Sequence, residues 1–152
     1  MPNSQFVYVT VIRTTPEKLW QALTEPEFTR QFWVGTIQES EWKPGSPWQI
    51  VAPTGKIIDS GEIVEIEPCK RLVLKWRHHL FPEMAADGDS IMTYEIEEKG
   101  DSVKLTLTHS NEVPDSKFIK GVSNGWPSIL SSLKSLLETG ESLESTRKWT
   151  LG

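Results

Sequence analysis

Hydrophobic and polar residues alternate along several short stretches of the chain, and this pattern predicts β-strands. The first stretch, at residues 6–14, is FVYVTVIRT, which is rich in Val, Ile and Tyr. Further strands are predicted on both sides of the turn KPGSP, over residues 57–68 and 71–79, and as a hairpin over residues 91–110 that turns at EKGD. Residues 81–90 are predicted to form a polar loop. Because the strands follow one another through short connections, we expect an antiparallel sheet.

Helical signals occur after the first strand and near the end of the chain. Thr15 has the side chain of an N-cap, Pro16 suits the first helical position, and Pro26 ends this helix and begins a second short one. The longest helix is predicted over residues 116–139, with Gly140 as its C-terminal stop. The order of strand, one or two short helices, six strands and a long helix predicts an α+β fold.

The predicted C-terminal helix carries an apolar face that continues across a proline. At about 100° per residue, eight apolar side chains share an arc of about 120° with Trp126: Phe118, Ile119, Val122, Ile129, Leu130, Leu133, Leu136 and Leu137. This phase favours one helix through Pro127, with a first half weakened by Gly121 and Gly125. Three interpretations stay open: a kink that follows a curved sheet, a soft segment that gates a cavity, or a helix that begins near Trp126.

The strand pattern also places polar side chains in the core layer. Alternate residues of a half-buried strand face the core, and the apolar ones are Leu72, Leu74, Trp76, Met92, Tyr94, Ile96, Val103, Leu105 and Leu107. The same alternation turns His78 and His109 inward and His79 outward. These histidines and the tyrosine are either core groups with hydrogen-bond partners or polar groups that orient a ligand in a cavity.

The composition suits one domain with a real core. The chain has 152 residues and a single cysteine, Cys69, which excludes an internal disulfide and a multi-cysteine metal site. We expect one domain over residues 1–140 and a loosely packed polar tail over residues 141–152, with Trp149 as its candidate for docking. Seven tryptophans in so short a chain indicate either a bulky core or an aromatic-lined pocket.

The charge pattern and the lengths of the apolar runs argue against nucleic-acid binding, a signal peptide and a membrane span. The net charge is −5 and the lysines and arginines are scattered, which argues against nucleic-acid binding. The start of the chain lacks a basic region followed by an apolar run, so we expect no signal peptide. No stretch approaches the roughly 18 apolar residues of a membrane span. We therefore expect a cytoplasmic protein.

The chemical motifs of the chain are weak. The sequence has no G-x-S-x-G, no H-E-x-x-H and no glycine-rich phosphate loop. With three histidines and one cysteine, and with His78 and His79 facing opposite ways, we expect no metal site and no cofactor. Asp59 and Glu62 share a strand, but neighbouring carboxylates are common by chance and carry no catalytic assignment.

Four stretches taken together resemble a known family. TTPEKLWQALTEPEFTRQFWVG, KPGSPWQI, SGEIVEIEPCKRLVLKW and GVSNGWPSILSSLKSLLETG are similar to bacterial proteins like the C-terminal domain of the activator of heat-shock protein 90 ATPase. These belong to the START-like, helix-grip (SRPBCC) superfamily, and the resemblance covers residues 6–140. It implies a curved antiparallel sheet of six to seven strands wrapped around the long C-terminal helix, with a cavity between them.

The resemblance leaves three function classes open. Helix-grip proteins bind lipids, sterols, flavonoids and polyketides, some are cyclases or hydrolases, and some act on chaperones. Members of this kind are often encoded near small helix-turn-helix regulators, which implies a stress or small-molecule response. The resemblance identifies no catalytic residue, and it leaves open whether the protein is a monomer or a homodimer.

Our first hypothesis is a binding protein for a small hydrophobic ligand, aromatic or lipid-like. The predicted pocket consists of Trp33, Trp48, Trp76, His78, Tyr94, Leu105, His109, Trp126, Leu130 and Leu133, with Trp33 and Trp48 at its mouth. The second hypothesis is a protein-interaction module, similar to a chaperone cofactor, whose cavity is filled by side chains. The third is an enzyme in which His78 or His109 acts as a general base.

Overall fold

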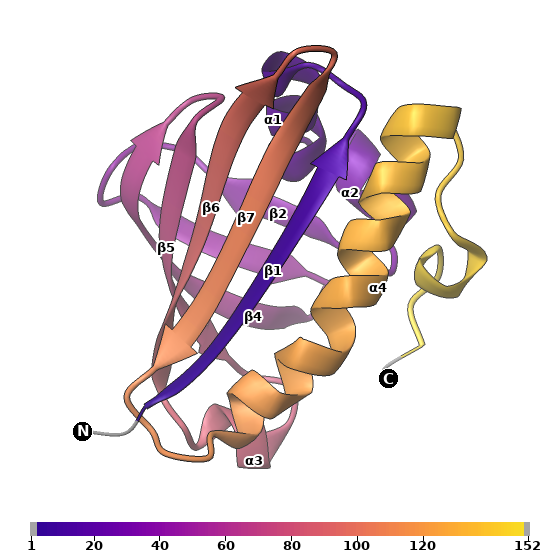
Figure 1. Ribbon diagram of the computed structural model, residues 1–152. Helices are drawn as coiled ribbons and strands as arrows, with labels where there is room; N and C mark the ends of the chain where they lie inside the picture. The colour runs from indigo at the N-terminus through magenta and orange to yellow at the C-terminus, as the bar shows by residue number, and fades with distance from the viewer. Residues whose placement is uncertain (1–2, 151–152) are drawn as a thin grey trace.

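The computed structural model describes residues 3–150 and contains one sheet whose strands wrap around a long helix (Figure 1). In chain order the elements are β1 (Ser4–Ile12), α1 (Pro16–Thr24), α2 (Pro26–Phe32), β2 (Ile37–Ser40), β3 (Pro47–Val51), β4 (Ile57–Glu67), β5 (Arg71–His78), α3 (Pro82–Ala85), β6 (Asp89–Lys99), β7 (Ser102–Asn111), α4 (Lys117–Thr139) and a 3₁₀ turn, η1 (Glu144–Thr146).

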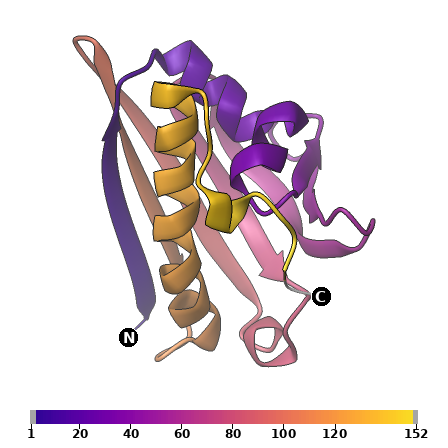
Figure 2. The same cartoon turned by 90° about the vertical axis from the view of Figure 1, so that its right-hand side faces the viewer.

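The sheet is antiparallel throughout and curves around α4. The strand order is β1-β7-β6-β5-β4-β3-β2, so β1 and β2 form its edges. Figure 2 shows α4 along the concave side, with α1 and α2 near its C-terminal end, α3 near its start, and the segment after α4 returning beside it. This arrangement confirms the predicted α+β, helix-grip fold.

Local signals in the sequence explain where the main helices begin and end. The Thr15 side chain accepts a hydrogen bond from Lys18 N at 3.2 Å, as the N-cap prediction requires. Ser116 does the same for Ile119 N at 3.1 Å, and Gly140 ends α4 with a φ of 87°. Since α4 continues through Pro127, the prediction of a single helix is confirmed, and the alternative start near Trp126 is wrong.

Two segments differ from the sequence-based expectation. The predicted loop at residues 81–90 contains the helical turn α3, in which Met84 N and Ala85 N donate to the carbonyl oxygen of Phe81. The strand predicted from residue 6 begins at Ser4 and ends at Ile12, because the turn before α1 already starts there.

The segment after α4 is not loosely packed. Leu143 N donates to the Ser132 hydroxyl oxygen at 2.9 Å, and the Thr146 hydroxyl lies 2.6 Å from the same oxygen. Val34 N donates to the carbonyl oxygen of Thr146 at 2.7 Å. Trp149 packs against the core, as its docking prediction proposed. Residues 151–152 of the predicted tail lie outside the described part of the chain.

A β-bulge and a glycine of β4 shape the inside of the sheet. Ile50 pairs with Asp59 and Val51 with Ile57, so Ile58 is an extra residue, a β-bulge. As a result both Ile58 and Asp59 are buried, although neighbours in a regular strand face opposite sides. Further along, Gly61 pairs with Trp48 on one side and Trp76 on the other, so two indoles meet across a residue without a side chain.

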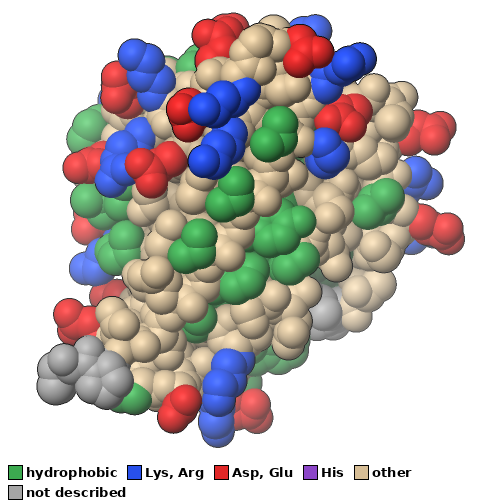
Figure 3. All heavy atoms as spheres, in the orientation of Figure 1, with side chains coloured by type: hydrophobic (Ala, Val, Ile, Leu, Met, Phe, Trp, Pro, Cys, Tyr) green, Lys and Arg blue, Asp and Glu red, His purple; other side chains and the backbone are tan. Residues whose placement is uncertain are grey.

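The outer surface carries charges of both signs and a few apolar side chains (Figure 3). On β1 the side chains of Val7, Val9 and Val11 are about half exposed, at 48%, 50% and 49%. Within residues 3–150, none of the helices has the length and apolar character needed to cross a membrane.

Substitution by alanine is expected to have opposite effects at Gly61 of β4 and at Gly125 of α4. A Cβ on Gly61 overlaps the carbonyl oxygen of Lys75, whereas a Cβ on Gly125 meets nothing within 4 Å. We expect Gly61→Ala to lower the free energy of unfolding by about 2 kcal/mol or more. We expect Gly125→Ala to raise it by up to about 1 kcal/mol, because alanine is the better helix former. Urea denaturation of both variants checks this, and equal changes of one sign would contradict it.

Candidate functional site

A cavity of about 430 Å³ lies between the first half of α4, the ends of β4 and β5, the α3 segment and η1. Its lining is formed by Trp33, Val34, Ile58, Asp59, Trp76, His78, Leu80, Phe81, Met84, Phe118, Gly121, Val122, Gly125, Trp126, Ser128, Ile129, Ser145 and Thr146. Phe81, Ser128 and Ser145 are exposed and mark its mouth. The lining is mostly apolar and aromatic, as in ligand sites of this size.

Small residues on one flank of α4 leave the room for this cavity. Gly121, Gly125 and Ser128 line it from the helix. A Cβ on Gly121 would come within 2.5 Å of the methyl carbon of Met84, so this glycine lets α3 approach the helix. A Cβ on Gly125 would meet nothing within 4 Å, so its missing side chain corresponds to open space. The glycines that weaken the helix therefore also shape the cavity.

Four tryptophans form one wall and the core behind it. The ring of Trp76 lies 4.6 Å from that of Trp48, 6.4 Å from that of Trp33 and 5.9 Å from that of Trp126, measured between centroids. Trp33 and Trp126 meet edge to face at 5.1 Å. Such tilted pairs are the favourable arrangement of aromatic rings. Trp33, Trp76 and Trp126 have a side toward the cavity, and Trp48 lies behind them.

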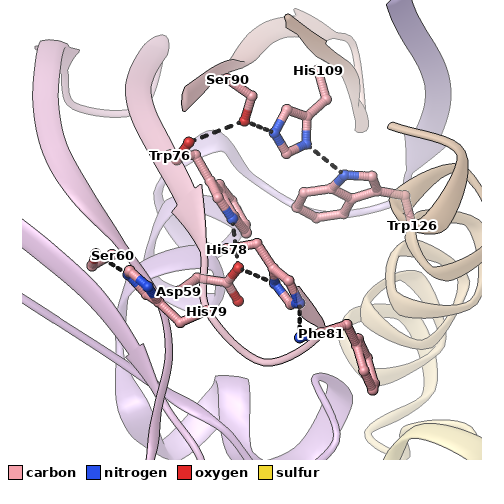
Figure 4. Close-up of polar contacts among 9 residues, drawn as sticks. All are labelled: Asp59, Ser60, Trp76, His78, His79, Phe81, Ser90, His109 and Trp126. Carbon is pink, nitrogen blue, oxygen red and sulfur yellow. Dashed lines mark hydrogen bonds and ion pairs between the residues drawn. The ribbon is translucent and has the colours of Figure 1, made fainter. Parts of the chain in front are cut away.

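One hydrogen-bond chain holds Trp126 through His109 (Figure 4). The indole N–H of Trp126 donates to Nδ1 of His109 at 3.1 Å, so the ring proton of His109 lies on Nε2, 2.8 Å from the Ser90 hydroxyl. The Ser90 hydroxyl in turn donates to the carbonyl oxygen of Trp76. Burial lowers the pKa of His109 to about 3, so this ring stays neutral at physiological pH.

A second chain joins β4 to β5 around Asp59 (Figure 4). Oδ1 of Asp59 accepts from the indole N–H of Trp76 at 2.8 Å and lies 2.7 Å from Nδ1 of His78. Phe81 N donates to Nε2 of His78 at 3.1 Å, which leaves the ring proton on Nδ1 for Asp59. Burial raises the pKa of Asp59, and the hydrogen bonds from His78 and Trp76 offset part of that effect.

The structure places only part of the predicted pocket around the cavity. Four of the ten predicted residues line it: Trp33, Trp76, His78 and Trp126. The other six are buried in the core without lining it: Trp48, Tyr94, Leu105, His109, Leu130 and Leu133. The cavity opens on the flank of α4, whereas the centre of its apolar arc is filled by packing against the sheet. As predicted, His78 and His109 are buried and His79 is exposed.

Sequence reasoning gave no role to the most buried charged residue of the site. Asp59 is 5% exposed and lines the cavity, while Glu62 of the same strand is exposed. Strand alternation does not reveal that Ile58 and Asp59 face the same way, because the bulge that causes it has no sequence signal here. Phe118 and Met84 also line the cavity; Phe118 had been placed on the helix face, and Met84 in the predicted loop.

The titratable groups of the site are arranged for hydrogen bonding rather than for metal binding. In the described part of the chain, no cluster of three or more His, Cys, Asp or Glu side chains has a geometry that could hold a metal ion. Both ring nitrogens of His109 and of His78 already have partners. The Tyr94 hydroxyl is buried without a partner within residues 3–150, and burial raises its pKa.

Comparisons with known proteins agree with this architecture. Residues 13–138 match the family model described as Activator of Hsp90 ATPase homolog 1-like protein. Among solved structures, protein MLL2253 from Mesorhizobium loti is 27% identical with a TM-score of 0.74, over 88% of this chain and 96% of that one. No curated protein sequence matches the chain.

Two further structures share the fold at lower identity. The Aha1 dimer from Colwellia psychrerythraea is 23% identical with a TM-score of 0.72, over 91% of this chain and 99% of that one. CalU16 from Micromonospora echinospora is 19% identical with a TM-score of 0.73, over 91% and 78% of the two chains. At this identity the likeness is one of fold.

The buried His109 predicts a loss of stability in mild acid. Its pKa is 6.5 when unfolded and about 3 when folded, so below pH 6.5 the unfolded chain takes up a proton that the folded chain does not. The contribution of His109 to the free energy of unfolding is therefore fully present above pH 6.5, and it is lost progressively as the pH decreases toward 3. Asp59, whose pKa is raised, acts in the opposite direction in acid.

A His109→Gln variant separates these contributions, since glutamine can still pair with Ser90 and Trp126. Between pH 6 and 5, we expect the wild type to lose roughly 1 kcal/mol more stability than the variant. Urea denaturation at pH 7, 6 and 5 measures this, with His79→Gln on the exposed face as the control for losing a histidine. Parallel pH profiles of the wild type and His109→Gln would contradict the assignment.

Proposed function

The chain belongs to the family of Activator of Hsp90 ATPase homolog 1-like proteins, and we propose that it binds a small hydrophobic ligand, aromatic or lipid-like, in the cavity between the sheet and α4. The observation that carries this proposal is the cavity itself. Its volume of about 430 Å³ is within the range of small-molecule sites, and its walls combine aromatic rings with a few fixed polar groups.

The cavity argues against a helix-grip core that is completely filled. A protein-interaction module would need no such space, and its large aromatic residues would pack against α4 along its whole length. Here the flank at Gly125 is left open, while the neighbouring Trp126 is 2% exposed and donates a hydrogen bond to His109. An open space beside rigid walls supports ligand binding, and a chaperone or other protein partner remains the alternative.

The hydrogen bonds of the histidines favour binding over catalysis. A general base needs a free ring nitrogen within reach of its substrate. In His109 the two nitrogens pair with Ser90 and Trp126, and in His78 they pair with Asp59 and Phe81. These pairings support a role in fixing the walls of the cavity. A part in a stress or small-molecule response stays a prediction.

A leucine at position 125 tests whether the cavity binds ligands. Because a Cβ there meets nothing within 4 Å and the residue lines the cavity, Gly125→Leu directs its side chain into the space. We expect it to weaken the binding of cavity ligands at least tenfold. Asn124→Leu adds the same side chain at an exposed position of the same helix and serves as the control.

The measurement is the change in tryptophan fluorescence during titration with flavonoids, fatty acids and polyketides. Trp33, Trp76 and Trp126 line the cavity, so an occupant changes their surroundings. Circular dichroism confirms that both variants are folded. If none of the ligand classes changes the fluorescence of the wild type, or if both leucine variants bind equally well, the proposed function is wrong.

A further inference from the structure

One oxygen of the Asp59 carboxylate accepts hydrogen bonds, and the other has no hydrogen-bond partner within residues 3–150. Oδ1 accepts hydrogen bonds from both Trp76 and His78. Oδ2 has no hydrogen-bond partner within residues 3–150, yet it is not among the fully enclosed unpaired atoms, so it keeps some accessible surface. Since Asp59 lines the cavity and is 5% exposed, that surface belongs to the cavity wall.

No lysine or arginine in the described part of the chain pairs with this carboxylate. Asp59 is the single acidic residue among those lining the cavity, and none of the lining residues is a lysine or an arginine. The electrostatic partners of Asp59 are the rings of His78 and His79. Nε2 of His78 accepts a hydrogen bond from Phe81 N, and His79 points to the outer face, where it pairs with Ser60 at 2.6 Å.

A buried carboxylate without a lysine or arginine partner is costly, and a cation that reaches it recovers part of that cost. Asp59 is therefore a site where a positively charged ligand group gains more than a neutral one does. The surroundings add to this preference, because Trp33, Trp76 and Trp126 line the same cavity and the faces of indole rings attract cations.

We infer that the cavity selects hydrophobic amines: ligands with an apolar, aromatic-sized body and a protonated amino group that donates to Oδ2 of Asp59. This inference rests on the proposed function, because it names the ligand class of the same cavity. Asp59 acts here as the residue that determines specificity. Asp59 faces the cavity because it pairs with His78 of β5 and alternates in phase with Gly61 and Ile63, and the bulge at Ile58 adds an apolar side chain beside it.

Four probes with one biphenyl body and different ends test the inference: 4-phenylbenzylamine, 4-phenylbenzyl alcohol, 4-methylbiphenyl and biphenyl-4-carboxylic acid. Calorimetry and ligand-observed NMR at pH 7 give their affinities for the wild-type chain. We expect the amine to bind at least tenfold more tightly than the alcohol or the hydrocarbon, and the acid to bind most weakly.

The substitution Asp59→Asn keeps the acceptor for Trp76 and His78 and removes the charge. We expect it to weaken amine binding at least tenfold and to leave alcohol binding within about threefold. Asp89→Asn removes a carboxylate that pairs with Arg77 and does not line the cavity, and it should leave the preference unchanged.

The outcomes separate the two proposals. If the alcohol or the hydrocarbon binds as tightly as the amine, the selection of amines is wrong while cavity binding stands. If the amine preference survives in Asp59→Asn, the role of Asp59 is wrong. If none of the four probes binds the wild type, the inference is wrong, and the titration with flavonoids, fatty acids and polyketides decides separately whether cavity binding stands. The comparison of probes on the wild type needs no variant, so it decides the ligand class even if Asp59→Asn does not fold.

Discussion

The structure depends on one requirement: Trp48, Trp76 and Trp126 must bury their large indole rings and still find an acceptor for the N–H. Trp48 donates to the side chain of Gln38 at 2.9 Å, Trp76 to Asp59 and Trp126 to His109. Each acceptor is in turn held by a second group, and Gln38, for example, donates to the carbonyl oxygen of Leu23 at 2.9 Å. Gln38, Asp59 and His109 are thus the buried polar partners that these three tryptophans need.

This requirement also explains why the cavity has rigid walls. Trp126 is fixed from α4 to β7 through His109, and the Ser90 hydroxyl carries the same chain to the backbone of Trp76. A wall held by consecutive hydrogen bonds does not collapse into the space beside Gly125. The helix that the sheet encloses therefore contributes both a packed stripe, centred on its leucines, and an open flank made of small residues.

Much of the fold and part of the site follow from patterns that the sequence displays. Helix phase across Pro127 predicted one helix, and strand alternation predicted the inward histidines, because both rest on regular backbone geometry. The extent of the cavity did not follow, since Trp126 lines it as predicted, whereas Leu130 and Leu133, predicted to line it too, are buried in the core. Gly125, whose missing side chain opens the flank, had been interpreted as a weak point of the helix, in a segment for which the gating of a cavity was one of three open interpretations.

Asp59 shows why chemistry was the hardest feature to predict. The extra residue at Ile58 places two consecutive side chains, Ile58 and Asp59, in the buried layer, and no periodic pattern of the sequence records such an insertion. The inward histidines drew attention because their residue type suggests catalysis, yet both have all their ring nitrogens occupied. The carboxylate keeps an unpaired oxygen at the cavity wall. In this fold the group positioned to contact a ligand is therefore the unpaired carboxylate oxygen of Asp59. The inward histidine rings, whose nitrogens all have partners, are not.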